Sequence, residues 1–463
     1  MASKPARFLR RLLAAIGRPA DAQPAAPPPF QVVLCAPVAA YAETVAAALE
    51  GMPGLRLRVV PVGQDDSGQQ GLTTATLIRV RQAMVDGEAD VAIWCEGFAN
   101  RLTLRWITPM QPDDERPGCF GMHVRMELTG SFESVFVELA HAATLAAIQP
   151  ESEERRRNHA TLLAAAAERA AIIAEVPPFL PHSRQQATTL FCVGHVAAAT
   201  AAVDEPLPWL ERSVAAYRRG LERLRPDDLP PMEEAIVYRR LAAALTALAE
   251  RSGDDVSRLR EAAAAWRNAA ETLPRASLPF EWATDQVRLG SALYRLDLKT
   301  GDPALLREAL AALQAALQVF TRSENPIRWT ETMLALAQVL EVYGDQSRNP
   351  DILQKAVDAC RAVLEVRTAE SDPAGRAATL NTLGSALFLL GKHGEGVHHL
   401  DEAAAVLRAA RDELRAMGAE KPAAVAERNL AHVDRLLRQR GGGGTSPRPP
   451  EPSGGEGATD EGA

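Results

Sequence analysis

The strongest constraint on the fold is a 47-residue repeat in the C-terminal half of the chain. Three similar stretches begin with a proline, and successive prolines are 47 residues apart, at Pro279, Pro326 and Pro373. Within each stretch a leucine, a small residue and a second leucine recur at helical spacing, as in Leu289, Gly290 and Leu293. A repeat of this length predicts helix pairs that bury their apolar faces by stacking on one another.

A second apolar set follows the first in every unit, as in Ala309, Leu313 and Ala316. Both sets also recur toward the N-terminus at shifts of 48 residues. Five helix pairs are therefore expected, starting near residues 183, 231, 279, 326 and 373. The small residue of the first helix suits a point where two helix backbones approach closely.

The first-helix motif stands out in "WATDQVRLGSALYRL" and "LNTLGSALFLLGK", and the second-helix motif in "ALAALQAAL" and "AAAVLRAA". Both motifs resemble the tetratricopeptide repeat family. The usual unit of that family has about 34 residues, whereas this one has 47, with the extra length near "DLKTGDPALLRE". HEAT and armadillo repeats, whose units are of similar length, are the alternative. The resemblance implies a right-handed solenoid whose first helices line a groove for a protein partner.

Residues 30–150 follow a different pattern, in which short β-branched runs alternate with helical stretches. Strands are predicted at residues 31–38, 55–62, 90–98 and 101–109, with a further candidate within 119–129. The order β-α-β-α-β-β-(β)-α indicates a small α/β domain. The stretch "GEADVAIWCEGFANRLTLRWITP" faintly resembles the TolB-type amino-terminal domain, a resemblance that implies a regulatory or interaction module.

The expected fold class is α+β multidomain, with a small N-terminal α/β domain followed by an all-α right-handed solenoid of helix pairs. The predicted regions are a basic leader and Pro/Ala linker (1–29), the α/β domain (30–150), a connecting helix (151–180), five helix pairs plus a capping helix (181–440) and a disordered tail (441–463). The tail has no apolar residue to anchor it.

Composition excludes several classes of partner and site. The net charge of −8 argues against nucleic-acid binding, which needs a basic face. The five cysteines are scattered and form no C-x-x-C pair, so neither disulfides nor a zinc site are expected. No stretch approaches the roughly 20 apolar residues of a membrane span, and we expect a cytoplasmic protein. The basic, amphipathic residues 7–18 allow weak contact with a membrane surface; a frayed leader is the alternative.

Catalytic and metal-binding motifs are missing from the sequence. It contains no phosphate-binding loop, no G-x-S-x-G and no H-E-x-x-H. His393, His398 and His399 are close in sequence, but His393 and His398 are five residues apart and form no i, i+4 ligand pair. We therefore expect no enzyme activity, no catalytic residue, no cofactor and no metal.

Two sets of residues remain as candidate binding sites. By position in the repeat, the partner-binding groove of the solenoid is expected to include Arg239, Val287, Ser291, Tyr294, Leu334, Gln338, Asn381, Ser385 and Phe388. Trp94, Glu96 and Trp106 could line a pocket at the sheet of the α/β domain. The alternative for both sets is packing, between neighbouring helix pairs or between the sheet and a helix.

The sequence therefore predicts a non-enzymatic scaffold or adaptor that binds a protein partner through the solenoid groove, with the α/β domain as a second or regulatory module. A different interpretation is a sensor, in which the α/β domain binds a small ligand and the solenoid relays the signal. The identity of the partner is not encoded in any motif.

Overall fold

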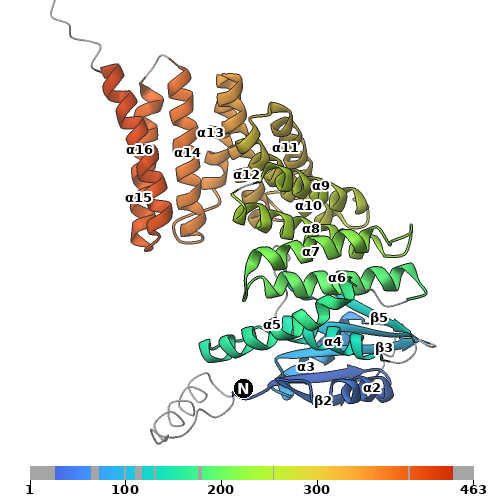
Figure 1. Ribbon diagram of the computed structural model, residues 1–463. Helices are drawn as coiled ribbons and strands as arrows, with labels where there is room; N and C mark the ends of the chain where they lie inside the picture. Colours follow the sequence, from blue (N-terminus) through green and yellow to red (C-terminus); the bar gives the residue numbers. More distant parts are fainter. Residues whose placement is uncertain are drawn as a thin grey trace, which may run out of the picture. The chain divides into compact units, whose positions relative to one another are not determined.

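The computed structural model of the chain describes residues 27–63, 72–98, 101–109, 117–121, 123–129, 132–175, 180–253, 255–394 and 397–441. Most of the predicted leader, the hairpin turn at Ala99 and Asn100, and the predicted tail beyond residue 441 lie outside these ranges. The chain forms two compact units, Met1–Thr272 and Leu273–Ala463. Figure 1 gives the labels of the elements in both units. No helix in the described ranges combines the length and apolarity of a membrane span.

The first unit contains a five-stranded sheet with strand order β2-β1-β3-β4-β5. The strands are β1 (Phe30–Ala36), β2 (Leu55–Pro61), β3 (Val91–Phe98), β4 (Arg101–Ile107) and β5 (Arg125–Thr129). Strand β1 pairs in parallel with β2 and β3, whereas β4 is antiparallel to both β3 and β5. The predicted order of strands and helices is confirmed.

Helices cover both faces of this sheet, which is why β1 is almost entirely apolar and buried. The helices are α2 (Ala39–Leu49), α3 (Thr74–Asp86) and α4 (Ser134–Ala146). Val80 and Met84 of α3 join a core cluster with Trp94 on one face. On the other face, the indole nitrogen of Trp106 donates to Thr144 of α4 at 3.0 Å. Thr73 caps α3, because its hydroxyl oxygen accepts a hydrogen bond from the backbone N–H of Thr76.

The remainder of the first unit is helical and continues directly from the sheet. It comprises α5 (Glu153–Glu175), α6 (Ser183–Thr200), α7 (Pro206–Leu221), α8 (Pro231–Arg251) and α9 (Val256–Thr272). Residues 187–200 of α6 are buried on every side because α6 packs against β5 and α4 as well as against α7. The first two helix pairs therefore belong to the same compact unit as the sheet.

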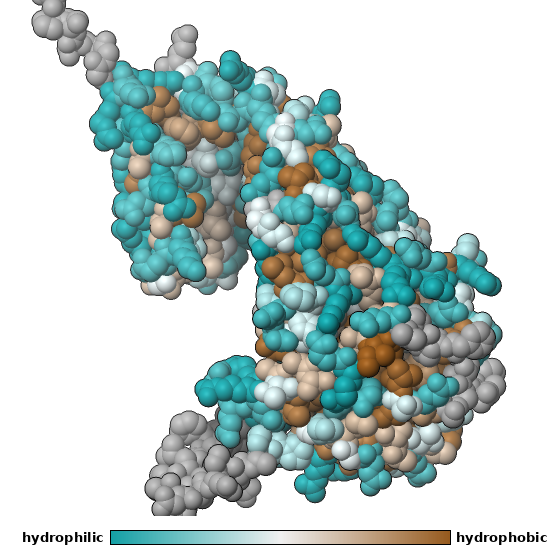
Figure 2. All heavy atoms as spheres, viewed as in Figure 1, coloured by the Kyte–Doolittle hydropathy of each residue, from teal (hydrophilic) through white to brown (hydrophobic). Residues whose placement is uncertain are grey.

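The second unit consists of helices stacked in sequence order. They are α10 (Pro279–Thr300), α11 (Pro303–Ala316), α12 (Pro326–Ser347), α13 (Pro350–Leu364), α14 (Pro373–His393), α15 (His398–Ala416) and α16 (Glu420–Gly441). The prolines that mark the repeat are the first residues of α10, α12 and α14, where a missing backbone N–H costs nothing. The helices of the five pairs begin at the predicted residues, and a helical-repeat solenoid is confirmed. Figure 2 shows a largely hydrophilic surface over the C-terminal helices.

In α10 and α14 the glycine of the first-helix motif faces the leucine at the centre of the second-helix motif. A Cβ atom added to Gly290 would lie 2.8 Å from Cγ of Leu313, and one added to Gly384 would lie 2.5 Å from Cγ of Leu407. Both distances are too short for packed carbon atoms. Glycine at these positions therefore permits the close approach of the two helices in each pair.

This contact predicts the effect of enlarging Gly384. We expect Gly384→Val to lower the free energy of unfolding by about 2 kcal/mol, because overpacking forces Leu407 and the helix backbones apart. Ala378→Val, at an exposed position of the same helix, should lose only about 0.5 kcal/mol of helix propensity. Urea unfolding followed by circular dichroism measures both. Equal losses for the two variants would contradict the close-approach interpretation.

Candidate functional site

A cavity of about 460 Å³ lies among α10, α12, α14 and α16 of the second unit. Consecutive members of the series α10, α12, α14 and α16 are neighbours, so the cavity walls come from four helices. Its lining residues are Asp297, Leu298, Gly301, Glu341, Val342, Asp345, Gln346, Ser385, Phe388, Leu389, Asn429 and His432. The cavity thus combines apolar side chains with three carboxylates.

Glu341 is the carboxylate most strongly affected by its surroundings. Glu341 lies on α12 and accepts a hydrogen bond from the hydroxyl of Ser385 on α14. Burial raises the pKa of Glu341 from its ordinary 4.5 to about 7; the bond from Ser385 opposes this shift, and the nearby Asp345 adds to it.

Asp297 is more deeply buried, with 1% of its surface exposed. Its Oδ2 accepts from Nε2 of Gln346 at 2.9 Å, whereas its Oδ1 accepts no hydrogen bond from any residue in the described ranges. Burial is the main reason that the pKa of Asp297 lies above its ordinary value. A carboxylate of this kind has unused capacity to accept hydrogen bonds.

Asp345 differs from the other two carboxylates because it has a cationic partner, Lys392, and also contacts His393. Its Oδ1 lies 2.9 Å from Nζ of Lys392 and 2.7 Å from Nε2 of His393. Burial opposes ionisation of Asp345, but the hydrogen bonds from Lys392 and His393 outweigh it and hold the pKa below its ordinary value. These bonds also tie α12 to α14.

The predicted groove residues fall into two groups. Ser385 and Phe388 line the cavity. Tyr294 lies beside it: burial, together with Glu341 and Asp297, raises the pKa of its hydroxyl to about 12. Oδ1 of Asn381 accepts from Nδ2 of Asn429, a lining residue, at 3.2 Å. The polar and aromatic positions of α14 are therefore at or next to the cavity.

Other predicted groove residues lie elsewhere. Val287 packs against the cluster of Ala283, Ala316 and Phe320, so its role is packing. The exposed Ser291 donates its hydroxyl hydrogen to the carbonyl oxygen of Val287. Leu334 and Gln338 are half-buried on α12 and are not among the residues that line the cavity.

Arg239 was also predicted for the groove, but it belongs to α8 of the first unit and only 6% of its surface is exposed. Arg239 does occupy the expected position of the repeat, but α8 has different neighbours from the first helices of the later pairs. The assignment of Arg239 to a solvent-facing groove is wrong.

The pocket predicted at Trp94, Glu96 and Trp106 is not formed by these residues together. Trp94 pairs with Arg105 across the β3–β4 ladder and Trp106 pairs with Ile93, so the two tryptophans point to opposite faces of the sheet. Both are almost fully buried. They pack the sheet against helices, which is the alternative that the sequence left open.

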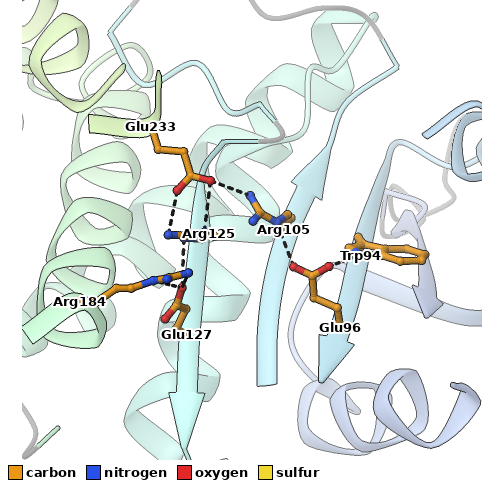
Figure 3. Close-up of polar contacts among 7 residues, drawn as sticks. All are labelled: Trp94, Glu96, Arg105, Arg125, Glu127, Arg184 and Glu233. Atoms are coloured by element: carbon orange, nitrogen blue, oxygen red, sulfur yellow. Dashed lines mark hydrogen bonds and ion pairs between the residues drawn. The ribbon is translucent and has the colours of Figure 1, made fainter. Parts of the chain in front are cut away.

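Glu96 instead joins a chain of ion pairs that links the sheet to the helices of the first unit (Figure 3). The network contains Glu96, Arg105, Glu233, Arg125, Glu127 and Arg184, with successive N–O distances of 3.3, 3.7, 2.8, 3.2 and 2.7 Å. Three carboxylates balance three guanidinium groups. Burial lowers the pKa of Arg125, and its neighbours Glu233 and Glu127 oppose this shift. The network fastens α6 and α8 to β4 and β5.

His195, another titratable side chain buried in the first unit, lies between the rings of Phe120 and Tyr217. Burial, with the charge of Arg240, lowers its pKa to about 3, so His195 is neutral at physiological pH. Its Nδ1 is 2.7 Å from the carbonyl oxygen of Phe191 in the same helix. These contacts are those of a core histidine.

One group in the described ranges could hold a metal ion. Potential ligand atoms of His398, His399 and Glu402 lie within 4.8 Å of one another at the start of α15. The guanidinium of Arg361 already lies 2.7 Å from Glu402 and would compete with a cation. His393, which the sequence places near these residues, is instead engaged with Asp345.

The chain was compared with known proteins. No known protein family matches it, and neither does any curated protein sequence. Among solved structures, the apo form of RapI matches at 14% identity over 62% of this chain and 95% of that chain, with a TM-score of 0.34. A circular tandem repeat protein matches at 19% identity over 66% and 80% of the two chains, with a TM-score of 0.28. Such low scores carry no argument about function.

The ion-pair network makes a prediction for Glu233. We expect Glu233→Gln to lower the free energy of unfolding by about 2 kcal/mol, because it removes one of the two carboxylates that pair with the buried Arg125. Glu211→Gln removes an exposed pair with Arg258 and should cost less than about 1 kcal/mol. Urea unfolding of the two variants is the measurement, and a loss for Glu233→Gln no larger than that of Glu211→Gln would contradict the assignment.

The raised pKa of Glu341 predicts a dependence of stability on pH. An acid whose pKa is higher in the folded than in the unfolded state loses stability as pH rises from its ordinary pKa, here 4.5, to its folded value of about 7. Glu341→Gln removes this loss. The free energy of unfolding of the variant, relative to that of the wild type, should therefore rise by up to about 3 kcal/mol between pH 5 and pH 8. Urea unfolding at the two pH values tests this. A constant difference would show that Glu341 ionises normally.

Proposed function

We propose that this protein is a non-enzymatic interaction scaffold or adaptor that binds a segment of a protein partner in the groove of its second unit. The observation that carries the proposal is the cavity itself, which lies between four helices and offers apolar walls beside polar acceptors. Grooves between helices that combine apolar anchoring positions with a few oriented polar groups suit helical or extended peptide segments.

The exposed apolar residues of the groove support this assignment. Leu298 lines the cavity, and 55% of its surface is exposed. Phe388 is half-buried at the same cavity. Aromatic and large aliphatic side chains in such positions are typical anchors of protein interfaces.

The detailed repeat class is also part of the proposal. A small residue of the first helix against the central residue of the second helix, as in Gly290 and Leu313, is the arrangement that favours a tetratricopeptide-like repeat over HEAT or armadillo repeats. In this assignment the 47-residue unit is a long variant whose extra residues lengthen the helices and their connection.

The α/β domain acts, in this proposal, as a second or regulatory module. The ion-pair network that joins β4 and β5 to α6 and α8 supports a structural connection between the sheet and the first helix pairs. The alternative function, a small-ligand sensor, needs a binding site in the α/β domain other than one shared by Trp94 and Trp106, which lie on opposite faces of the sheet. The TolB-type resemblance stays a prediction.

Affinity capture with the full-length protein tests the proposal. We expect Leu298→Glu to abolish retention of proteins that the wild type retains, because it places a charge on the apolar wall of the cavity without disturbing the core. Ile327→Glu is the matched control, since Ile327 is 72% exposed and is not part of the cavity lining. Identical sets of retained proteins for Leu298→Glu and Ile327→Glu would mean that the groove is not the binding site.

A further inference from the structure

Two carboxylates in the groove cavity have no cationic partner within the part of the chain that the structure describes. Asp297 of α10 is hydrogen-bonded by Gln346, and Glu341 of α12 by Ser385. The third carboxylate, Asp345, is paired with Lys392 and His393. The cavity therefore holds two acidic groups whose charges are not balanced from within.

Burial makes this imbalance costly. A carboxylate removed from water without a counter-ion is strongly disfavoured in its charged form. Asp297, which lines the cavity, is 99% buried, and its buried Oδ1 has no hydrogen-bond donor among the described residues. The raised pKa values of Asp297 and Glu341 reflect the same cost. A donor from outside the chain would relieve it.

Asp297 also differs from the residues at the equivalent position of the next two first helices, where packing favours glycine. The residues 47 and 94 positions later are Gly344 and Gly391. Added Cβ atoms at these glycines would lie 2.7 Å from Leu353 and 2.6 Å from Leu400, so both are needed for close packing. An acidic side chain at the equivalent position of α10 contradicts that packing rule. Such departures are expected where a residue serves a function.

We propose that the cavity receives an arginine side chain of the bound partner segment, with Asp297 and Glu341 as the acceptors of its guanidinium group. This inference rests on the proposed function and names the chemistry of the partner. The two carboxylates come from neighbouring helices and line the same cavity, and a guanidinium offers several donors in one plane, whereas an ammonium is a single compact charge.

The remaining walls of the cavity fit the rest of an arginine side chain. Leu298, Val342 and Leu389 provide apolar surface for its methylene groups. Phe388 provides an aromatic ring at the same cavity, and guanidinium groups stack on such rings. The net charge of −8 also favours the approach of a basic partner.

Binding of short probes to the full-length protein tests this inference. The probes are the capped tripeptide amides Leu-Arg-Leu, Leu-citrulline-Leu and Leu-Lys-Leu, and binding is measured by calorimetry. Citrulline keeps the shape of arginine and removes its charge. We expect the arginine probe to bind at least about tenfold more tightly than the citrulline probe and more tightly than the lysine probe, as charged hydrogen bonds require.

Variants assign the effect to the two carboxylates. Asp297→Asn and Glu341→Gln keep the size of each side chain and remove a buried charge, so both should fold. Each is expected to weaken the arginine probe by about tenfold and to leave the citrulline probe unchanged. Glu331→Gln, at an exposed position of α12 paired with Arg328, is the control and should change neither probe.

Several results would overturn the inference. These are equal binding of the arginine and citrulline probes, equal binding of the arginine and lysine probes, no binding of the arginine probe at millimolar concentration, or unchanged arginine binding by both carboxylate variants. None of them removes the proposed function, which stands or falls with the loss of captured partners in Leu298→Glu. A captured partner together with equal arginine and citrulline binding would mean that the groove binds protein without an arginine.

Discussion

The close contact between the two helices of each pair is the constraint on which the second unit depends. Gly290 leaves room for Leu313, and Gly384 leaves room for Leu407, so the second helix fits tightly against one side of the first. Because this contact recurs, every pair presents its first helix on the same side of the stack, and α10, α12 and α14 become neighbours. None of the residues lining the cavity belongs to a second helix. The cavity is therefore lined by the sides of the first helices that do not pack against the second helices.

The helix pairs could be predicted from sequence because the signals that define them are local. Proline at the start of α10, α12 and α14 and the recurring leucines require no knowledge of distant contacts. The connection between the sheet and the helices could not be predicted in this way. Arg125 and Glu233 are 108 residues apart, and nothing in the sequence marks either as the partner of the other. Their pairing depends on how α8 packs beside the sheet.

Prediction of the candidate site from the sequence was limited in the same way. Tyr294 and Phe388 were predicted from their repeat position, and Glu341 lies midway between them, 47 residues from each, so the spacing alone was sufficient to include it. The same spacing misplaced Arg239, because α8 belongs to the unit that contains the sheet and its equivalent face is buried. Repeat position predicts which side of a helix a residue occupies. Whether that side meets solvent depends on the neighbours of each pair.

The differences between repeats therefore matter more for function than their common pattern. Within the second unit, the position of Asp297 is glycine in α12 and α14, and the position of Glu341 is aromatic in α10 and α14, so the pair of unbalanced carboxylates occurs at the junction of α10 and α12. In a solenoid each repeat contacts only its neighbours, and stability is close to a sum of such junctions. A cation held between these two carboxylates adds favourable interactions to one junction and removes a cost of burial from the same place. Partner binding and the stability of the stacked helices are then coupled at that junction.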